Sequence, residues 1–283
     1  MRGAGLRVLK IGPLATIQDR GRPGFAAAGV PRGGAWDLDT LRAALAAVEG
    51  ADDDAAIELP LLGATFLVEG AAVASIDGAK AIVLTDGDTL EVPRCERAVR
   101  YVALRGGVEV PRVLGARATL TVAHLGGIDG RPLRVGDRLA IGAPHRPGEP
   151  SAAHVPAQLD DAPLECLPAA NGALDALDAL CARAWRIDPR SDRVGTRLDG
   201  APLDRVPPRV RSRPLVRGAI QLPPDGRPIV IGPDGPTTGG YPVLAVLGHA
   251  ACSSLAQRRP GATVRFVIAR SPLDARRTPV DAR

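Results

Sequence analysis

Short apolar or alternating runs, separated by Gly, Pro and Asp, recur along the whole chain. Runs of about four to eight residues between such turn residues are typical of β-strands, and their regular succession favours an antiparallel architecture of barrels or sandwiches. The predicted strands lie within residues 88–93, 98–107, 118–127, 137–142, 164–168, 227–232, 241–248 and 263–270. The sequence therefore predicts a mainly β protein.

Helical spacing of apolar residues is found in a few short segments only. These segments are residues 37–49, 174–185 and 248–258. In the first, Asp37 is placed to cap the amino terminus and Gly50 to end the helix. We expect a few short helices added to a framework of strands.

The periodic pattern stops between residues 142 and 163, a stretch rich in proline. Proline clusters without apolar periodicity are typical of linkers. A chain of 283 residues also exceeds the usual size of a single domain. We therefore predict a β domain over residues 1–143, a linker over residues 144–162 and a second β domain over residues 163–283.

Two segments rich in glycine and proline, residues 16–37 and 218–242, hold most of the candidate chemistry. Glycine permits positive φ and close backbone approach, and proline fixes φ, so the shape of such loops is largely set by their sequence. Polar side chains on rigid loops are what a preorganised site requires. We expect the two segments to form one site.

The polar side chains of these loops and the neighbouring turns suit a small anionic or amide substrate. Arginine forks bind carboxylate or phosphate bidentately, and hydroxyls and amides orient a lactam or acyl group. Substrate contacts are predicted for Asp19, Arg22, Arg117, Thr119, Gln221, Thr237 and Thr238, and catalytic roles for Asp234 and Tyr241.

Structural explanations compete at several of these positions. Asp19 and Arg22, three residues apart, would form a local ion pair that stiffens the loop. Asp234 would cap the turn before the threonines instead of acting as a base. Tyr241 lies between Gly240 and Pro242 and is therefore poorly placed for regular strand packing. A role in lining a pocket and a purely structural role are equally well supported for it. Arg193 lies in a predicted turn.

Composition excludes several classes of function. Only Lys10 and Lys80 of the 36 basic residues are lysines, and aromatic residues make up 2% of the chain, so the net charge of +5 does not indicate a nucleic-acid surface. The cysteines and histidines stand singly, without metal-ligand spacing, and no metal is expected. No long apolar run predicts a membrane span, and we expect a cytoplasmic protein. P-loop, Rossmann, zinc-protease and hydrolase-elbow motifs are absent.

Ordered motifs along the chain resemble one family. GPLATIQDRGRPG begins at Gly12, GVPRGGAWD at Gly29 and LRGGVEVPRVLGARAT at Leu104; RVGDRL, SDRVGTRLDG, GAIQLPPDGRPIV, PTTGGYP and LAQRRPGATVRF follow in the family's order. The chain resembles the KipA family, also described as the C-type subunit of 5-oxoprolinase or as the second subunit of allophanate hydrolase. It is also similar to half of the carboxyltransferase domain of urea carboxylase.

The resemblance implies a cyclophilin-like β-barrel in each half and ATP-dependent opening of 5-oxoproline to glutamate. That activity belongs to a complex in which a KipI-like protein and a lactam-hydrolase-like protein join this chain, with ATP and its magnesium used by the complex. A carboxyltransferase component of a biotin-dependent, urea-type carboxylase is the alternative. A non-catalytic regulatory binding protein is the alternative from another class.

The chain departs from the family's usual residues at a few positions. Lys80 stands where an aspartate is common, Ala116 and Ala118 replace two serines, Arg213 stands where glutamate is common, and Ala251 where aspartate is common. The changes of charge would alter which ligand charges a pocket attracts. Activity on the family's usual substrate therefore needs to be tested by experiment.

Overall fold

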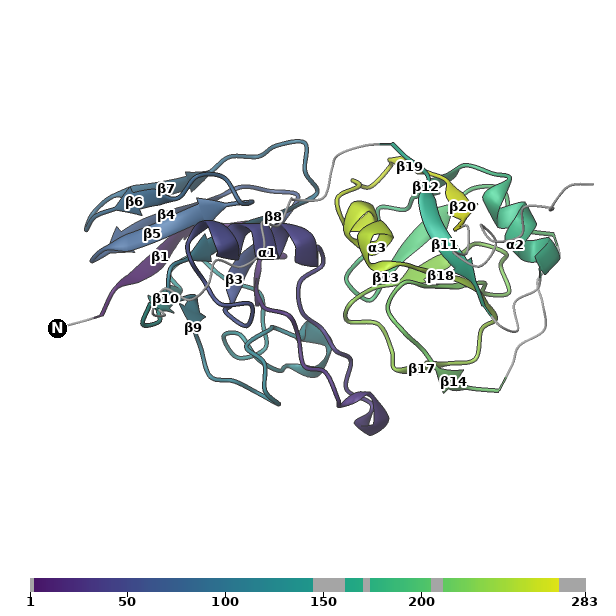
Figure 1. Cartoon of the computed structure of the whole chain (residues 1–283), viewed down its shortest axis with the longest axis horizontal. Coiled ribbons are helices and arrows are strands. Elements are labelled where there is room, and N and C mark those ends of the chain that lie inside the picture. Colours follow the sequence, from purple (N-terminus) through teal and green to yellow (C-terminus); the bar gives the residue numbers. More distant parts are fainter. Residues whose placement is uncertain (1–2, 145–160, 170–173, 205–210, 270–283) are drawn as a thin grey trace, which may run out of the picture.

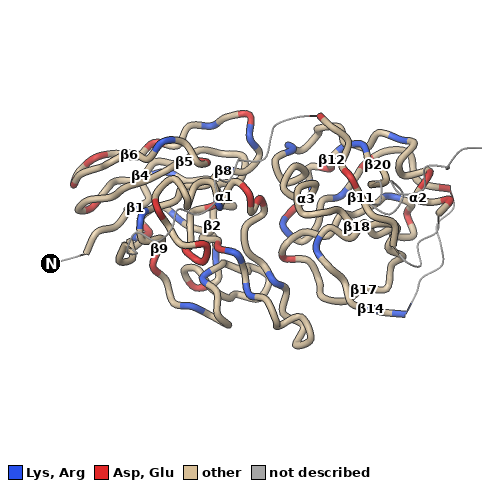
Figure 2. The backbone as a smooth tube through the Cα atoms, viewed as in Figure 1, with Lys and Arg blue, Asp and Glu red and all other residues tan. Residues whose placement is uncertain are grey.

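The computed structural model describes residues 3–144, 161–169, 174–204 and 211–269. Most of the predicted linker, residues 145–160, lies outside them, so the domain boundaries stay a prediction. Figure 1 shows two rounded halves side by side, the first built from residues before this gap and the second from residues after it. Figure 2 shows acidic and basic residues interspersed over both halves.

The first half is built from two antiparallel five-stranded sheets. One has the order β7 (Thr89–Val92), β4 (Ala64–Glu69), β1 (Gly5–Lys10), β10 (Arg138–Ile141) and β9 (Val108–Glu109). The other has the order β2 (Thr16–Gln18), β3 (Ala56–Pro60), β8 (Val99–Leu104), β5 (Ala72–Ile76) and β6 (Ile82–Leu84). Both sheets contribute side chains to one shared apolar core.

Alternation along β8 places successive side chains on opposite faces of its sheet. Val102 and Leu104 join the core between the two sheets. Val99 and Tyr101 pack instead on the other face, against helix α1 (Leu38–Ala47). The predicted cap of this helix is confirmed, because the Asp37 carboxylate accepts hydrogen bonds from the N–H groups of Asp39 and Thr40.

The second half contains an eight-stranded sheet that nearly closes on itself. Its order is β19 (Thr263–Val264), β12 (Trp185–Ile187), β13 (Gly195–Asp199), β16 (Ile229–Ile231), β15 (Ala219–Gln221), β18 (Val243–Leu247), β11 (Leu164–Pro168) and β20 (Phe266–Ile268). The two edge strands are consecutive in the chain and only Arg265 separates them. The edges of the sheet are therefore adjacent, which confirms a mainly β, barrel-like fold.

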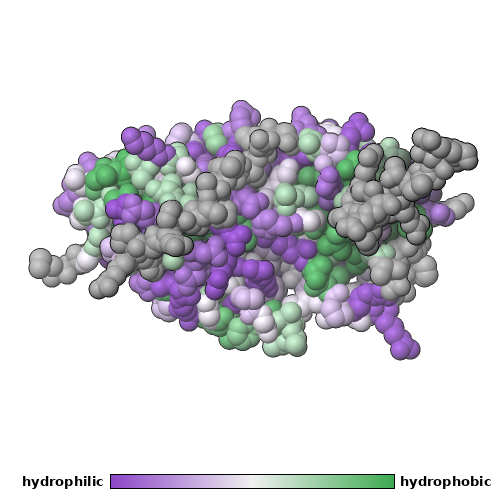
Figure 3. Space-filling view, viewed as in Figure 1, coloured by the Kyte–Doolittle hydropathy of each residue, from purple (hydrophilic) through white to green (hydrophobic). Residues whose placement is uncertain are grey.

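Short elements complete this half and link it to the first. Helices α2 (Leu174–Cys181) and α3 (His249–Ala256) confirm two predicted helices, and β14 (Arg213–Pro214) pairs with β17 (Thr238–Gly239) in a small ribbon. Helix α3 contacts α1 across the junction. The surface in the same view is a mixture of hydrophilic and hydrophobic areas, with a hydrophobic area on the second half beside the junction (Figure 3).

Two predictions of secondary structure were wrong in part. Residues 118–127 do not form a strand but bend through a 3-10 turn, Thr121–Ala123, because His124 and the two glycines that follow Leu125 adopt positive φ. The predicted helix over residues 174–185 ends at Cys181, and Trp185 instead begins β12. The Trp185 ring reaches the core from that strand, with its N–H bound to the Leu180 carbonyl at 3.1 Å.

Candidate functional site

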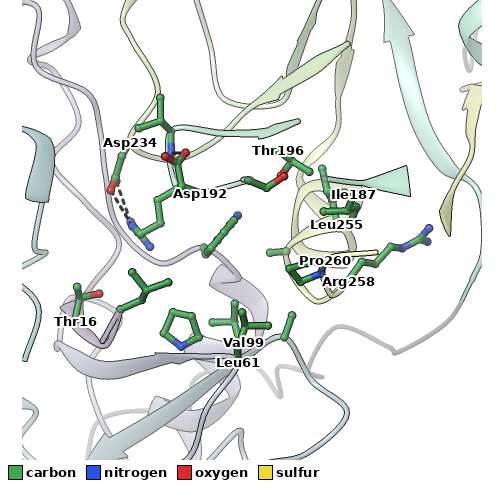
Figure 4. A pocket seen from close by; sticks show the side chains of 18 of the residues that line it. Thr16, Leu61, Val99, Ile187, Asp192, Thr196, Asp234, Leu255, Arg258 and Pro260 are labelled. Atoms are coloured by element: carbon green, nitrogen blue, oxygen red, sulfur yellow. Dashed lines mark hydrogen bonds and ion pairs between the residues drawn. The ribbon is translucent and has the colours of Figure 1, made fainter. Parts of the chain in front are cut away.

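The largest cavity described lies between the two halves and has a volume of about 290 Å³. We call it the junction cavity. Figure 4 shows side chains from both halves directed into it. Its walls are mainly apolar, and its polar side chains are Thr16, Thr121, Ser191, Asp192, Arg193, Thr196, Asp234 and Arg258. Small-molecule sites have this composition, and the volume lies near the lower end of their usual range of about 300–1,000 Å³.

An ion pair between Arg193 and Asp234 forms one wall of the junction cavity. Arg193 precedes β13 and Asp234 follows β16, and these antiparallel neighbours bring the two loops together. The guanidinium donates two parallel bonds to the carboxylate, Nε to Oδ2 at 2.8 Å and Nη2 to Oδ1 at 2.9 Å. The Asp234 N–H also binds the Arg193 carbonyl at 3.0 Å. Asp234 therefore has a fixed position and orientation.

Arg193 also reaches into the first half. Its Nη1 pairs with Glu58 Oε1, and its Nη2 donates to the Gly34 carbonyl at 2.6 Å. Glu58 lies on β3 and its side chain is fully buried. Burial by itself would lower the pKa of Arg193, but the carboxylates of Glu58 and Asp234 outweigh it and raise that pKa. The arginine therefore stays charged and holds two buried carboxylates together.

The network continues from Glu58 to the cap of α1. The Tyr101 hydroxyl donates to Glu58 Oε2 at 2.7 Å and accepts from the Asp37 N–H at 2.8 Å. Burial and the nearby Glu58 charge raise the pKa of Tyr101 well above its usual value, so this hydroxyl remains a donor. The Asp37 carboxylate accepts from Gln257 Nε2, in the second half, at 2.6 Å. Polar contacts thus connect the halves at both ends of the network.

The side chain of Asp19 has a structural role in the loop of residues 16–37. Its carboxylate accepts from the N–H of Gly21 at 2.7 Å and from the N–H of Arg117 at 2.6 Å. The Arg117 guanidinium turns toward Glu109, with which it forms an ion pair at 2.8 Å. Thr119 is next to this segment, and its N–H binds the carbonyl of Ile17 at 2.8 Å. These bonds attach the loop to residues 109–119.

Arg22 is only 1% exposed. Its Nη2 donates to the carbonyl of Ala118, whereas its Nη1 has no hydrogen-bond partner in the part of the chain that the structure describes. Burial lowers the pKa of Arg22, and the charges of Asp19 and Asp234 oppose that effect. Arg22 Nη1 and Asp234 Oδ1 lie 3.1 and 3.7 Å from the position that a β-carbon on Gly33 would occupy, so the two groups are neighbours.

Near Arg22, the buried atoms Gln18 Oε1 and Thr119 Oγ1 also lack partners among the described residues. Gln18 and Thr119 touch each other, because Gln18 Nε2 donates to the Thr119 carbonyl at 3.0 Å. Buried polar groups are nearly always hydrogen-bonded, to protein, water or ligand. Gln18, Arg22 and Thr119 are not among the residues that line the junction cavity, so these atoms are buried beside it and not in its walls.

The other predicted site residues form a separate group in the second half. Gln221 Nε2 donates to the Tyr241 carbonyl at 3.5 Å, and the Thr237 carbonyl accepts from the N–H of Leu215. Thr238 lies on β17, which Figure 1 shows at the end of this half away from α3. The structure thus brings Asp234 next to Arg22 and its neighbours. Gln221, Thr237, Thr238 and Tyr241 are not among the residues that line the junction cavity.

Sequence reasoning missed Glu58 and Tyr101, and it placed Arg193 in a turn among the polar side chains of rigid loops without identifying its partners. A detectable signal existed at Glu58, because a single acidic residue occurs in the strand AIELP, in which every residue is buried. A charged side chain in such a strand requires a partner. The partner of Glu58, Arg193, is 135 residues away in the sequence. The strand pattern therefore indicates that Glu58 needs a cation but not which residue provides it.

The positions that depart from the family's usual residues do not line the junction cavity. Lys80 and Arg213 are exposed, and Ala251 packs at the edge of the second core. Ala116 and Ala118 are buried beside Arg22, whose Nη2 binds the Ala118 carbonyl. Because alanine has no polar side-chain atom, the contact with Arg22 is made by the backbone carbonyl of Ala118.

No group of three or more His, Cys, Asp or Glu side chains is placed to bind a metal ion within the described ranges. The same residues contain no helix that is both long enough and apolar enough to cross a membrane.

Comparisons with known proteins identify close relatives. The family model for the carboxyltransferase domain, subdomain A and B, matches residues 28–268. The C-type subunit of 5-oxoprolinase from Escherichia coli is 33% identical over 93% of this chain and 90% of its own length. That of Haemophilus influenzae is 31% identical over 92% and 89%. The crystal structure of Kluyveromyces lactis urea carboxylase superposes with a TM-score of 0.86 at 27% identity, over 95% of this chain and 28% of that one.

Proposed function

The chain belongs to the family of carboxyltransferase domains with subdomains A and B, and on this basis we propose that it is the C-type subunit of an ATP-dependent 5-oxoprolinase. The observation that carries the proposal is the extent of the match. The E. coli protein is matched over 90% of its length, whereas the urea carboxylase chain is matched over 28%. The match therefore extends over nearly all of a 5-oxoprolinase C-type subunit but over only a part of the carboxylase chain.

We place the substrate in the junction cavity. Its volume of about 290 Å³ suits a small lactam, and its apolar walls would surround the ring. The Asp234 carboxylate, fixed by Arg193, retains lone pairs that accept a hydrogen bond from the lactam N–H. In this position Asp234 faces the reacting amide group. The reaction itself adds water across the lactam C–N bond and yields the amine and the second carboxylate of glutamate.

Arg22 is proposed to act through Asp234. Its unpartnered Nη1 is close to Asp234 Oδ1, so its positive charge helps to hold that carboxylate in place. Thr119 and Gln18, with unpartnered oxygens in the same loop region, would bind a water molecule or a polar substrate atom. A role for Tyr241 and the neighbouring threonines in the reaction stays a prediction.

The remaining parts of the reaction are assigned to the complex. The relatives are named as one subunit of 5-oxoprolinase, which implies other subunits. We propose that a KipI-like protein and a lactam-hydrolase-like protein complete the enzyme, and that ATP with magnesium is consumed by the assembly. The cytoplasmic location predicted from the sequence stays a prediction.

A carboxyltransferase component of a biotin-dependent carboxylase is the second candidate. The TM-score of 0.86 to urea carboxylase favours it, because 95% of this chain superposes on 28% of that enzyme. Biotin would then be carried by another chain. A regulatory protein that binds a partner without catalysis is the third candidate, and the buried, fully paired Arg193 network would serve it as a rigid scaffold.

Reconstitution separates these candidates. The chain is co-expressed with KipI-like and lactam-hydrolase-like partners, and ADP release is measured with 5-oxoproline, with urea plus biotinylated carrier, or with neither. The 5-oxoprolinase role predicts ADP release that depends on 5-oxoproline and on this chain. Carboxyl transfer to urea would favour the second candidate, and stable binding without any turnover the third.

Two variants test the site within that assay. Asp234→Asn keeps the shape of the side chain but removes its charge, and we expect turnover to fall by at least tenfold. Asp199→Asn is the matched control, since Asp199 is an exposed carboxylate on β13 in the same half. Equal activity of both variants would remove Asp234 from the mechanism while leaving the assignment to 5-oxoprolinase intact.

A further inference from the structure

A second cavity, of about 210 Å³, lies between the halves and is strongly basic. We call it the basic pocket. Its basic lining residues are Arg20, Arg32, Arg217 and His249. No aspartate or glutamate is among the described residues that line it. Such a concentration of arginine forks around a small concave space is typical of sites that bind phosphate or carboxylate.

The arginines of the basic pocket are held by bonds to the backbone. Arg217 donates from Nη1 to the Ala35 carbonyl at 3.1 Å and from Nη2 to the Trp36 carbonyl at 2.5 Å. Arg32 Nε donates to the Arg20 carbonyl at 3.2 Å. The terminal amino groups of Arg32 have no hydrogen-bond partner among the described residues and remain available as donors.

The positive charge of the pocket is only partly neutralised by its surroundings. Asp52 lies 3.7 Å from Arg20 but pairs more closely with Arg42, at 2.8 Å. Asp39 contacts His249 at 2.7 Å. Arg32 and Arg217 have no carboxylate partner among the ion pairs of the described residues. An anion entering the pocket would therefore meet an excess of positive charge.

The amino terminus of α3 adds to this field. His249, the first residue of the helix, lines the pocket, and the N-cap residue Gly248 provides no side-chain cap. The free N–H groups and the dipole at a helix amino terminus favour an anion nearby. This feature is independent of the arginines and favours the same kind of ligand.

The basic pocket is adjacent to the junction cavity. Pro233 lines the basic pocket and Asp234 lines the junction cavity. A narrow space of about 10 Å³ lies between the two, with Trp36 and Thr196 from the junction cavity and Arg217 and Cys252 from the basic pocket in its walls. A group bound in the basic pocket would thus lie next to a molecule bound beside Asp234.

We propose that the basic pocket binds a phosphate group, through Arg20, Arg32 and Arg217, next to the substrate cavity. The phosphate comes either from a nucleoside triphosphate or from free inorganic phosphate. The assignment to a nucleotide rests on the proposed ATP-dependent function, whereas the affinity for phosphate rests on the pocket alone. The pocket is too small for an extended acidic peptide, which would need a long groove.

Calorimetric titration of the full chain tests the proposal. The probes are sodium phosphate, ATP with and without magnesium, and adenosine, which has no phosphate, all at one ionic strength. Wild-type chain should bind phosphate and ATP but not adenosine. Tighter binding of ATP would identify the nucleotide as the source, and equal or tighter binding of phosphate would identify the free ion.

The variants Arg32→Gln and Arg20→Gln should each weaken binding of both anions by about tenfold, the effect of losing one charge-assisted hydrogen bond. Arg32→Lys keeps the charge but not the fork and should retain part of the affinity. Arg211→Gln, an exposed arginine outside the pocket, is the matched control. Thermal unfolding of each variant confirms that it is folded.

Failure of phosphate and ATP to bind at millimolar concentration would overturn the proposal. Binding that is the same in the pocket variants and the control would overturn it as well, because the anion would then sit elsewhere. Neither result depends on 5-oxoproline or on a second protein. If the chain binds phosphate but does not support 5-oxoproline turnover, the proposed phosphate site is supported and only the proposed function is refuted.

Discussion

The two loop segments are both rich in glycine and proline but have different surroundings in the molecule. In residues 16–37 the charged side chains of Asp19, Arg22 and Asp37 are at most 2% exposed. In residues 218–242 Asp234 is 3% exposed, whereas Thr238 lies exposed on the small ribbon. The difference teaches that loop composition determines rigidity, whereas neighbouring segments determine whether a polar side chain is buried.

The contacts of the two segments explain the difference. Gly33 donates its N–H to the Pro233 carbonyl at 3.0 Å, which is the point where the segments meet. From there the first segment continues between the halves, with Gly34 bound by Arg193 and Ala35 by Arg217. The second segment turns away into β17. Substitutions at matched positions should therefore have unequal effects in the two segments.

The largest effect is expected for Arg193→Met. This change leaves Glu58 and Asp234 buried without their cation, and removing one partner of a buried pair costs about 3–5 kcal/mol. Arg213→Met, at an exposed position on β14, should change the free energy of unfolding by less than about 0.5 kcal/mol. Urea unfolding of both variants measures the difference. Equal midpoints would show that the buried network does not stabilise the junction.

Arg22→Ala should have the next largest effect. It removes a buried charge that binds the Ala118 carbonyl, a loss of about 1.5–3 kcal/mol in the free energy of unfolding. Lysine at this position should restore little, because a point charge cannot replace the planar fork. Thermal unfolding and turnover of the reconstituted complex are compared. Normal stability with a tenfold to hundredfold loss of substrate affinity would instead show that Arg22 contacts the substrate directly. Such a loss corresponds to about 1.4–2.8 kcal/mol of binding free energy.

A smaller effect, with the opposite sign, is expected for Thr119→Val. The Thr119 hydroxyl is buried without a partner among the described residues, so its replacement by a methyl group of similar size should leave stability unchanged or raise it by up to about 1 kcal/mol. Thr89→Val, at an exposed position on β7, is the control. A clear loss of stability at residue 119 would show that the hydroxyl binds a water molecule, and a loss of turnover alone that it binds substrate.

The smallest effect is expected for the reactivity of Cys166, which lies in the core of the second half and outside both loop segments. Burial, with a contribution from the neighbouring Cys181, raises the pKa of Cys166 to about 12. At pH 8 this thiol is protonated and should react far more slowly with iodoacetamide than Cys95, which is half-buried in a loop. Mass spectrometry of the labelled native protein gives the order of reaction. Rapid labelling of Cys166 would mean that the second half opens readily.

Local patterns predicted much of the fold. The strand runs at residues 88–93, 98–107 and 241–248, and the capped helix after Asp37, are found where periodicity placed them. The sequence did not predict the first strands, such as β3 and β4, and it predicted a strand at residues 118–127 where the chain bends. Tertiary contacts decide between a strand and a bend when glycines are near. The structure places Asp234 beside Arg22 and Tyr241 in another group, and the roles of these residues in a site stay predictions.

The sequence by itself determined that the chain is mainly β, that two rigid loop segments exist and which family it belongs to, because these properties depend on local spacing and ordered motifs. Only the tertiary structure decided that Arg193 pairs with Glu58 and Asp234, and that Arg20, Arg32 and Arg217 surround one pocket. Charges far apart in the sequence interact only when the fold brings them within a few ångströms and excludes water from between them.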